Sequence, residues 1–159
     1  MACNHNCNYP IGSVSHGTMA PEDLIPDFLW ELKNQAGKPH VTRKSRTAAM
    51  KTYRAISKRS DSEGYYETED SDFDLEALVD ALEWFAGPYF YFGAHPGDGS
   101  DYGYWLSESF DEEFDGLRVN DLSEIPAEYR GEVLVVNDHG NMTLYVKTSR
   151  AMREVWAVV

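Results

Sequence analysis

Three polar side chains in the segment HPGDGSD are of types that bind metals or transfer protons. His95, Asp98 and Asp101 bring one imidazole and two carboxylates into seven residues of a glycine-rich stretch. Such groups can hold a divalent cation or act as general acid and base. The same composition suits a tight turn, because Pro, Gly, Asp and Ser satisfy its dihedral angles and backbone hydrogen bonds. The spacing does not match the twelve-residue calcium loop between two helices, so a turn is the favoured interpretation.

A second group of candidate ligands stands at the start of the chain. Cys3, His5 and Cys7 follow a C-x-H-x-C spacing, and His16 could join them if the segment folded back. Structural zinc sites use four ligands and normally space their cysteines as C-x2-C. The favoured interpretation is therefore a flexible N-terminal arm over residues 1–17, with metal binding as the alternative.

His139 is a further candidate for acid–base catalysis. It follows Asp138 in DHGN, a sequence typical of a hairpin turn. A catalytic role would require the fold to bring His139 beside residues 95–101. The chain contains no glycine-rich phosphate loop, no nucleophile elbow and no HExxH motif. We therefore predict no cofactor and favour a protein that is not an enzyme.

The elements that must position these groups fall into a helical half and a strand half. Apolar spacing and capping residues predict three helices, at about 18–37, 42–59 and 73–86. Pro26 should kink the first helix or mark its true start. Ser71 and Asp74 resemble a capping box for the third. Apolar runs predict five strands, at 89–92, 102–106, 132–136, 142–147 and 153–159. Phe110 and Phe114 suggest one helical turn among acidic residues.

This order of elements indicates an α+β fold. We expect three N-terminal helices packed on a C-terminal antiparallel sheet of about five strands. The 159 residues are most simply one domain over 18–159, with an acidic linker at 60–72. Neither a membrane span nor signal-peptide features are visible in the sequence, so we expect a cytoplasmic protein.

Charge is segregated along the chain. Nine Lys or Arg and no acid lie between Lys33 and Arg59, whereas seventeen Asp or Glu and no base lie between Ser60 and Leu117. The net charge is −13. Such acidity argues against direct binding of nucleic acid or an anionic membrane, since both are polyanions. It favours the basic surface of another protein as partner.

The third helix should carry an acidic stripe. Glu76, Asp80 and Glu83 recur at helical spacing, and each like-charged pair costs roughly 0.2–0.5 kcal/mol. The basic second helix could relieve part of this repulsion by packing beside the third. Acids and tyrosines farther along complete the candidate binding surface: Asp111, Glu112, Glu113, Asp115, Tyr102 and Tyr104. Tyrosine beside carboxylates suits the docking of a basic protein, although a half-buried sheet face has the same composition.

Three strings of the sequence resemble a family of small acidic proteins of unknown function. The strings are SVSHGTMAPEDLIPDFLWEL (13–32), YFGAHPGDGSDYGYW (91–105) and EVLVVNDHGNMTLYV (132–146). That family is encoded by bacteriophages and by integrative or plasmid elements. The resemblance implies an accessory protein of a mobile element, acting in the host cytoplasm, with counter-defence as its class of function. It assigns no catalytic or binding residue.

The leading hypothesis is a non-enzymatic accessory protein that presents an acidic, tyrosine-containing surface to a basic host protein. In one version the carboxylates mimic nucleic acid in a basic groove. One alternative is a metal-dependent or acid–base enzyme centred on His95, Asp98 and Asp101. The other is a homo-oligomer, in which the basic helix of one copy meets the acidic stripe of another.

Overall fold

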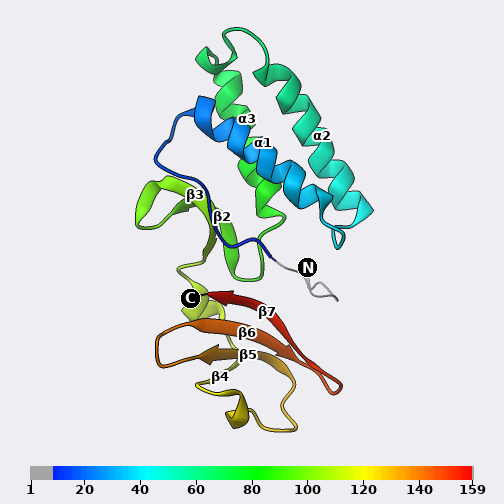
Figure 1. Ribbon diagram of the computed structural model, residues 1–159, viewed down its shortest axis with the longest axis vertical. Coiled ribbons are helices and arrows are strands. Elements are labelled where there is room, and N and C mark those ends of the chain that lie inside the picture. Colours follow the sequence, from blue (N-terminus) through cyan, green and yellow to red (C-terminus); the bar gives the residue numbers. More distant parts are fainter. Residues whose placement is uncertain (1–8, 159) are drawn as a thin grey trace. The chain divides into compact units, whose positions relative to one another are not determined.

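The computed structural model describes residues 9–158, which form two compact units. The N-terminal unit covers Pro10–Ser107, and the C-terminal unit begins at Glu108 (Figure 1). Each unit buries apolar side chains of its own. The predicted α+β class is confirmed, because helices and mainly antiparallel strands occupy separate stretches of the chain. A single domain over 18–159 stays a prediction.

Three helices make up most of the N-terminal unit: α1 (Pro21–Gly37), α2 (Arg43–Ser60) and α3 (Glu69–Glu83). Helix α1 begins at Pro21. The first N–H groups of a helix have no partner within the helix, so the N–H that proline lacks costs no hydrogen bond here. Pro26 therefore lies inside α1 and does not mark its start. Thr42 caps α2 at the predicted start of the second helix, since its hydroxyl accepts a hydrogen bond from the Ser45 N–H.

The third helix begins earlier than the sequence predicts. A short 3-10 helix, η1 (Tyr65–Glu67), and the first turn of α3 both lie within residues 60–72, where a linker is expected. Ser71 is buried inside α3, and its hydroxyl donates to the Thr68 carbonyl at 2.9 Å. The Asp74 carboxylate binds Arg59 of α2. The predicted capping box is thus wrong, because Ser71 lies inside the first turn of α3 with a local hydrogen bond, and a tertiary contact with Arg59 occupies Asp74.

A three-stranded antiparallel sheet completes this unit, in the order β1–β3–β2. Its strands are β1 (Gly12–Ser15), β2 (Phe90–His95) and β3 (Asp98–Leu106). The predicted hairpin of β2 and β3 is confirmed, but its strands continue into the segment expected as a loop. Residues 12–15 correct the expectation of a flexible arm over 1–17, because their backbone pairs with β3.

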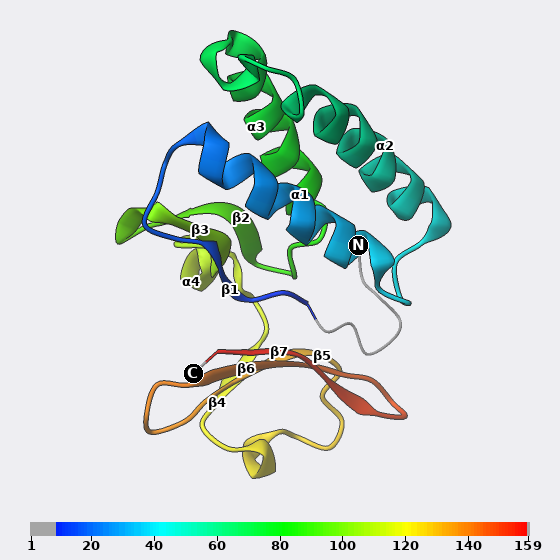
Figure 2. The same ribbon diagram turned by 45° about the horizontal axis from the view of Figure 1, so that its top comes forward.

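Helices α1 and α3 cover one face of this sheet, and α2 packs against both of them (Figure 2). Phe28 of α1 is fully buried, with its ring centre 5.0 Å from that of Phe92 and 5.7 Å from that of Tyr102. Leu78 and Leu82 of α3 are also fully buried. Each such side chain contributes about 1.5–3 kcal/mol on burial. α1 therefore meets the sheet through the side that carries Phe28, and the side of α3 that carries Leu78 and Leu82 faces the core.

The C-terminal unit is a four-stranded sheet, in the order β4–β5–β6–β7. Its strands are β4 (Leu117–Val119), β5 (Gly131–Val136), β6 (Met142–Lys147) and β7 (Met152–Val158). The last three match predicted strands and pair antiparallel, whereas β4 pairs parallel to β5. The described residues thus place seven strands in two sheets, where one sheet of five was expected, because the hairpin of β2 and β3 pairs with β1.

Two short helices flank β4 in the C-terminal unit, α4 (Phe110–Glu113) and η2 (Leu122–Glu124). α4 is the predicted single turn, and its Phe110 ring packs on Phe114 and Trp156. Between residues 9 and 158, no helix is both long and apolar enough to cross a membrane.

Candidate functional site

The outer face of α3 exposes two large aromatic side chains among acidic residues. Phe73 is 64% exposed and Trp84, in the turn that ends α3, is 74% exposed. At 100° per residue both lie on the same side of the helix as Ala77 and Asp80, with Glu76 beside them. All five side chains are exposed, and we call them the α3 outer face. Large apolar groups this exposed commonly mark an interaction site.

The carboxylates of the α3 outer face have no counter-charge in direct contact. Glu76 and Asp80 form no hydrogen bond or ion pair with any residue between 9 and 158. Glu83, the third acid of the predicted stripe, accepts a hydrogen bond from the Phe92 N–H at 2.6 Å. It ties the end of α3 to β2. The predicted stripe therefore contains two free carboxylates and one structural carboxylate.

The basic residues of α2 divide into two sets by their contacts. Arg59 binds Asp74, and Arg46 donates to the carbonyls of Ala36 and Lys38 at the end of α1, at 2.9 and 3.1 Å. The exposed remainder forms no ion pair with residues 9–158: Arg43, Lys44, Lys51, Arg54 and Lys58. In this part of the chain, the neutralisation expected between the second and third helices is limited to one ion pair.

That ion pair belongs to a polar cluster in which Asp74 and Tyr65 are buried and Arg59 is partly exposed. Both nitrogens of the Arg59 fork bind the Asp74 carboxylate, with Nε 2.9 Å from Oδ2. The Tyr65 hydroxyl donates to the same Oδ2 at 2.8 Å. The hydrogen bond from Arg59 holds the pKa of Asp74 below its usual value, with Tyr65 adding to it and burial opposing it. The pairing of all three groups points to a structural role.

The residues of the 95–101 segment lie on the β2–β3 hairpin and are engaged in local contacts. His95 accepts a hydrogen bond from the Gly97 N–H through Nδ1 at 3.0 Å, and its ring packs edge-on against Trp105. Asp98 accepts hydrogen bonds from the hydroxyl and the N–H of Ser100, which lower the pKa of Asp98. These are the side-chain-to-backbone bonds of a tight turn.

The other candidates for metal or acid–base chemistry belong to different elements of the chain. Asp101 accepts a hydrogen bond from the Ser13 hydroxyl of β1. His139 is exposed in the turn between β5 and β6, in the C-terminal unit, while His16 is exposed beyond β1. Among residues 9–158, no group of three or more His, Cys, Asp or Glu side chains is placed to hold a metal ion. Three candidates lie outside the described residues: Cys3, His5 and Cys7.

Four acids of the predicted binding surface belong to the C-terminal unit, whereas α3 belongs to the N-terminal unit. Asp111 forms an ion pair with Arg118 at 2.8 Å, and Glu113 accepts a hydrogen bond from the Ser109 hydroxyl. Glu112 and Asp115 are exposed. The acidic excess is thus shared between the two units, and α3 carries the part that is combined with exposed aromatic rings.

The two tyrosines of the predicted surface belong to the sheet of the N-terminal unit. Tyr102 is half-buried against Phe28. Tyr104 is 1% exposed, so it is a core residue and corrects the expectation that it faces a partner. Its hydroxyl finds no hydrogen-bond partner within the described part of the chain, and burial raises the pKa of Tyr104.

The sequence reasoning missed the two aromatic residues that define the α3 outer face. Phe73 and Trp84 are eleven residues apart, which is close to three full turns of helix. With the helix register known, that spacing places both rings on the side of Asp80. The signal was present in the sequence, because both residues lie within the helix predicted at 73–86.

Comparison of the chain with protein-family models, with curated proteins and with solved structures gives no match. The assignment of the α3 outer face therefore depends on its own geometry.

Proposed function

We propose that this chain is a non-enzymatic binding protein that presents the α3 outer face to a basic protein. The observation that carries the proposal is the exposure of two unpaired carboxylates, Glu76 and Asp80, between the exposed rings of Phe73 and Trp84. Aromatic side chains supply much of the binding energy at protein interfaces. Carboxylates around them select a basic partner and speed its approach.

The charge of the whole chain supports a basic partner. A net charge of −13 gives a negative field that attracts basic proteins and repels nucleic acid. Each unpaired carboxylate on α3 also repels its neighbours, so an approaching Lys or Arg removes a repulsion as well as making a contact. Both effects weaken as salt rises.

In the cell, we place the chain in the host cytoplasm, as an accessory protein of a mobile element with a role in counter-defence. In one version of the proposal its carboxylates occupy phosphate positions in a basic nucleic-acid groove. Residues four apart on a helix are separated by about 6 Å along its axis. Asp72, Glu76 and Asp80 therefore form a regular row of negative charge.

The test is affinity capture from a host-cell lysate over a salt series, followed by a binding titration with the purified captured protein. We expect a basic protein whose capture falls as the salt concentration rises. Capture that is indifferent to salt contradicts the proposal. For the mimicry version, duplex DNA added to the titration should displace the chain from the captured protein, and failure to displace it removes that version.

Variants locate the binding surface. Replacing Glu76 by Gln and Asp80 by Asn should weaken binding of the purified partner by roughly tenfold, equal to about 1.4 kcal/mol. Two neutral replacements in the C-terminal unit, Glu112→Gln and Asp115→Asn, remove the same charge and serve as the matched control. If the control pair weakens binding as much as the α3 pair, the α3 outer face is not the site.

A further inference from the structure

The outer face of α2 is complementary to the α3 outer face. Counted from Lys44, residues 48, 51, 55 and 58 return to the same side of the helix. All five side chains are exposed, and they alternate between lysine and alanine: Lys44, Ala48, Lys51, Ala55 and Lys58. We call this set the α2 outer face. It presents positive charge around small side chains, whereas α3 presents negative charge around large rings.

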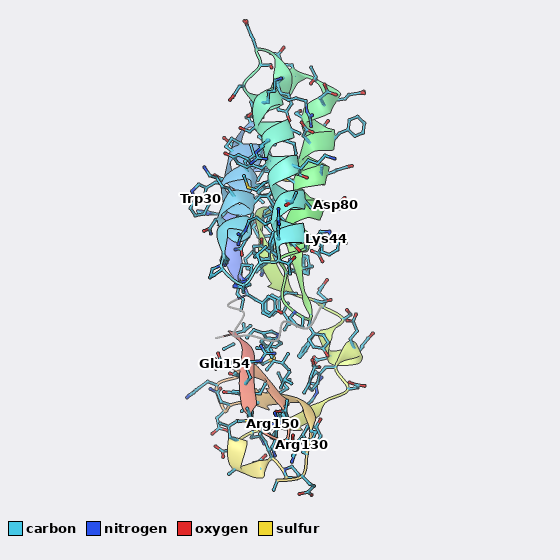
Figure 3. The ribbon with its side chains drawn as sticks, turned by 90° about the vertical axis from the view of Figure 1, so that its right-hand side faces the viewer. Trp30, Lys44, Asp80, Arg130, Arg150 and Glu154 are labelled. Atoms are coloured by element: carbon cyan, nitrogen blue, oxygen red, sulfur yellow. The ribbon has the colours of Figure 1, made fainter. Side chains whose placement is uncertain are left out.

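These two faces do not meet within one chain. α2 and α3 lie side by side and run antiparallel, since the short segment containing η1 joins them (Figure 1). Lys44 and Asp80 lie on the same side of the unit, and Trp30 of α1 lies on the opposite side (Figure 3). Two helices that point their charged faces the same way cannot cover one another. A second molecule is needed to bring the charges together.

We infer that a second copy of this chain covers the α3 outer face with its own α2 outer face. A twofold axis parallel to the two helices places α2 of each copy against α3 of the other. Both copies then use the same pair of surfaces, as a closed dimer requires. The second copy covers the same α3 outer face that the proposed basic partner would bind, so the dimer and that partner compete for this face.

The ion pair between Arg59 and Asp74 gives the register of this contact. It joins Arg59 and Asp74 across two antiparallel helices, so their backbone positions lie within about one turn of the same height, which is the reach of an arginine side chain. Asp80 stands six residues beyond Asp74, which corresponds to six residues before Arg59, between Lys51 and Arg54. A twofold axis parallel to the helices preserves height, so Asp80 faces these two bases of the second copy.

The same register places Trp84 against the small residue Ala48 of the second copy. An alanine lets the indole ring approach the helix backbone closely. Lys44 and Lys51 stand on either side of Ala48, and their methylene stems and ammonium groups can pack over the ring. The contact thus combines apolar burial with relief of like-charge repulsion on both helices.

Sedimentation velocity of the full chain over a range of concentrations and salt tests the inference. We expect a dimer at low salt whose dissociation constant rises as salt increases. Trp84→Ala should raise that constant by about tenfold or more. Trp30→Ala is the matched control, since Trp30 is 67% exposed but lies on the far side of the unit, and it should leave the constant unchanged.

A charge exchange tests the pairing itself. Asp80→Lys and Lys51→Glu should each abolish the dimer when studied alone, because each places like charges opposite one another. Mixed in equal amounts, the two variants should dimerise again, since each faces the charge it needs. Both residues are exposed, and thermal unfolding of each variant verifies that its fold is intact.

A monomer at low salt at every concentration overturns the inference, as does equal loss of the dimer in Trp84→Ala and Trp30→Ala. Failure of the mixed variants to associate overturns the pairing of Asp80 with Lys51. The Lys51→Glu variant tests the proposed function separately from the dimer. It keeps the acidic face, so it should still bind the captured basic protein. Loss of that binding alone counts against the proposed function, and loss of the dimer alone does not.

Discussion

Arg59 of α2 holds the carboxylate of Asp74 on α3 with both nitrogens of its fork, and so joins the basic and acidic segments of the chain directly. Asp74 is 6% exposed, and the Tyr65 hydroxyl satisfies it from a third direction. The other charged side chains near this cluster are exposed. One ion pair between the basic and acidic segments therefore stabilises the fold, and most charged side chains of α2 and α3 remain on the surface.

Asp74 should make the stability of the protein fall in acid. Its pKa is lowered in the folded state, so its contribution is fully present above the ordinary Asp pKa of about 3.9 and is lost as pH falls through the lower folded value. Asp74→Asn should lower the free energy of unfolding by about 1–3 kcal/mol at neutral pH. Urea unfolding at several pH values measures this, and the difference between wild type and variant should shrink in acid. Asp80→Asn, which removes an exposed and unpaired carboxylate, should produce no such difference.

Tyr65→Phe and Tyr104→Phe remove the same hydroxyl group and should have unequal effects. The Tyr65 hydroxyl donates to Asp74, so its loss should cost about 1 kcal/mol. The Tyr104 hydroxyl is buried without a partner in the described part of the chain, so its loss should be neutral or stabilising. Thermal and urea unfolding of the two variants measure both effects. Equal destabilisation would show that Tyr104 has a bonding partner in solution.

Gly103→Ala should detach β1 from the sheet. A methyl group at this position would lie 2.2 Å from the Gly12 carbonyl oxygen and 2.8 Å from the Ser13 Cα. Backbone atoms of a paired strand cannot move aside, so we expect a loss of about 1–3 kcal/mol in the free energy of unfolding. Gly99→Ala, on the same strand but with no atom within 4 Å, is the control. Hydrogen exchange of the β1 amides shows whether the damage is confined to this strand.

Glu76→Gln should stabilise the protein while it weakens binding. Glu76 lies four residues from both Asp72 and Asp80, and relief of each repulsion is worth roughly 0.2–0.5 kcal/mol at low ionic strength. The gain should vanish as salt rises, because salt screens exposed charges. Unfolding at two salt concentrations measures the gain, and the titration with the basic partner measures the loss. A stabilised variant that binds as tightly as wild type would exclude Glu76 from the binding surface.

Elements with strong local signals could be predicted from the sequence. Thr42 caps α2 through its own side chain, and the hairpin of β2 and β3 follows from two apolar runs around a turn. The shortest strands could not be predicted from the sequence. β4 has three residues and β1 has four, which is too few for an alternating pattern. Both form because they pair with the edge of a longer strand.

The candidate surface was predicted in part, from charge. Glu76 and Asp80 are exposed acids at the expected spacing, but Glu83 is used by the sheet and Tyr104 is in the core. Sequence spacing alone does not tell which carboxylate will accept a hydrogen bond from a backbone N–H, since that depends on where β2 passes the end of α3. The exposure of Phe73 and Trp84 likewise depends on which side of α3 packs against α1 and β2, and this is decided by the tertiary structure.

By itself the sequence determined the α+β class, the amphipathic faces of the helices and the segregation of charge, because these follow from composition and from the periods of helix and strand. Only the tertiary structure decided which charges are used. Packing brings Arg59 to Asp74 and leaves the outer faces of α2 and α3 uncovered, side by side. Distance between charges, and not their order along the chain, sets whether they neutralise one another within the fold or remain available to a partner.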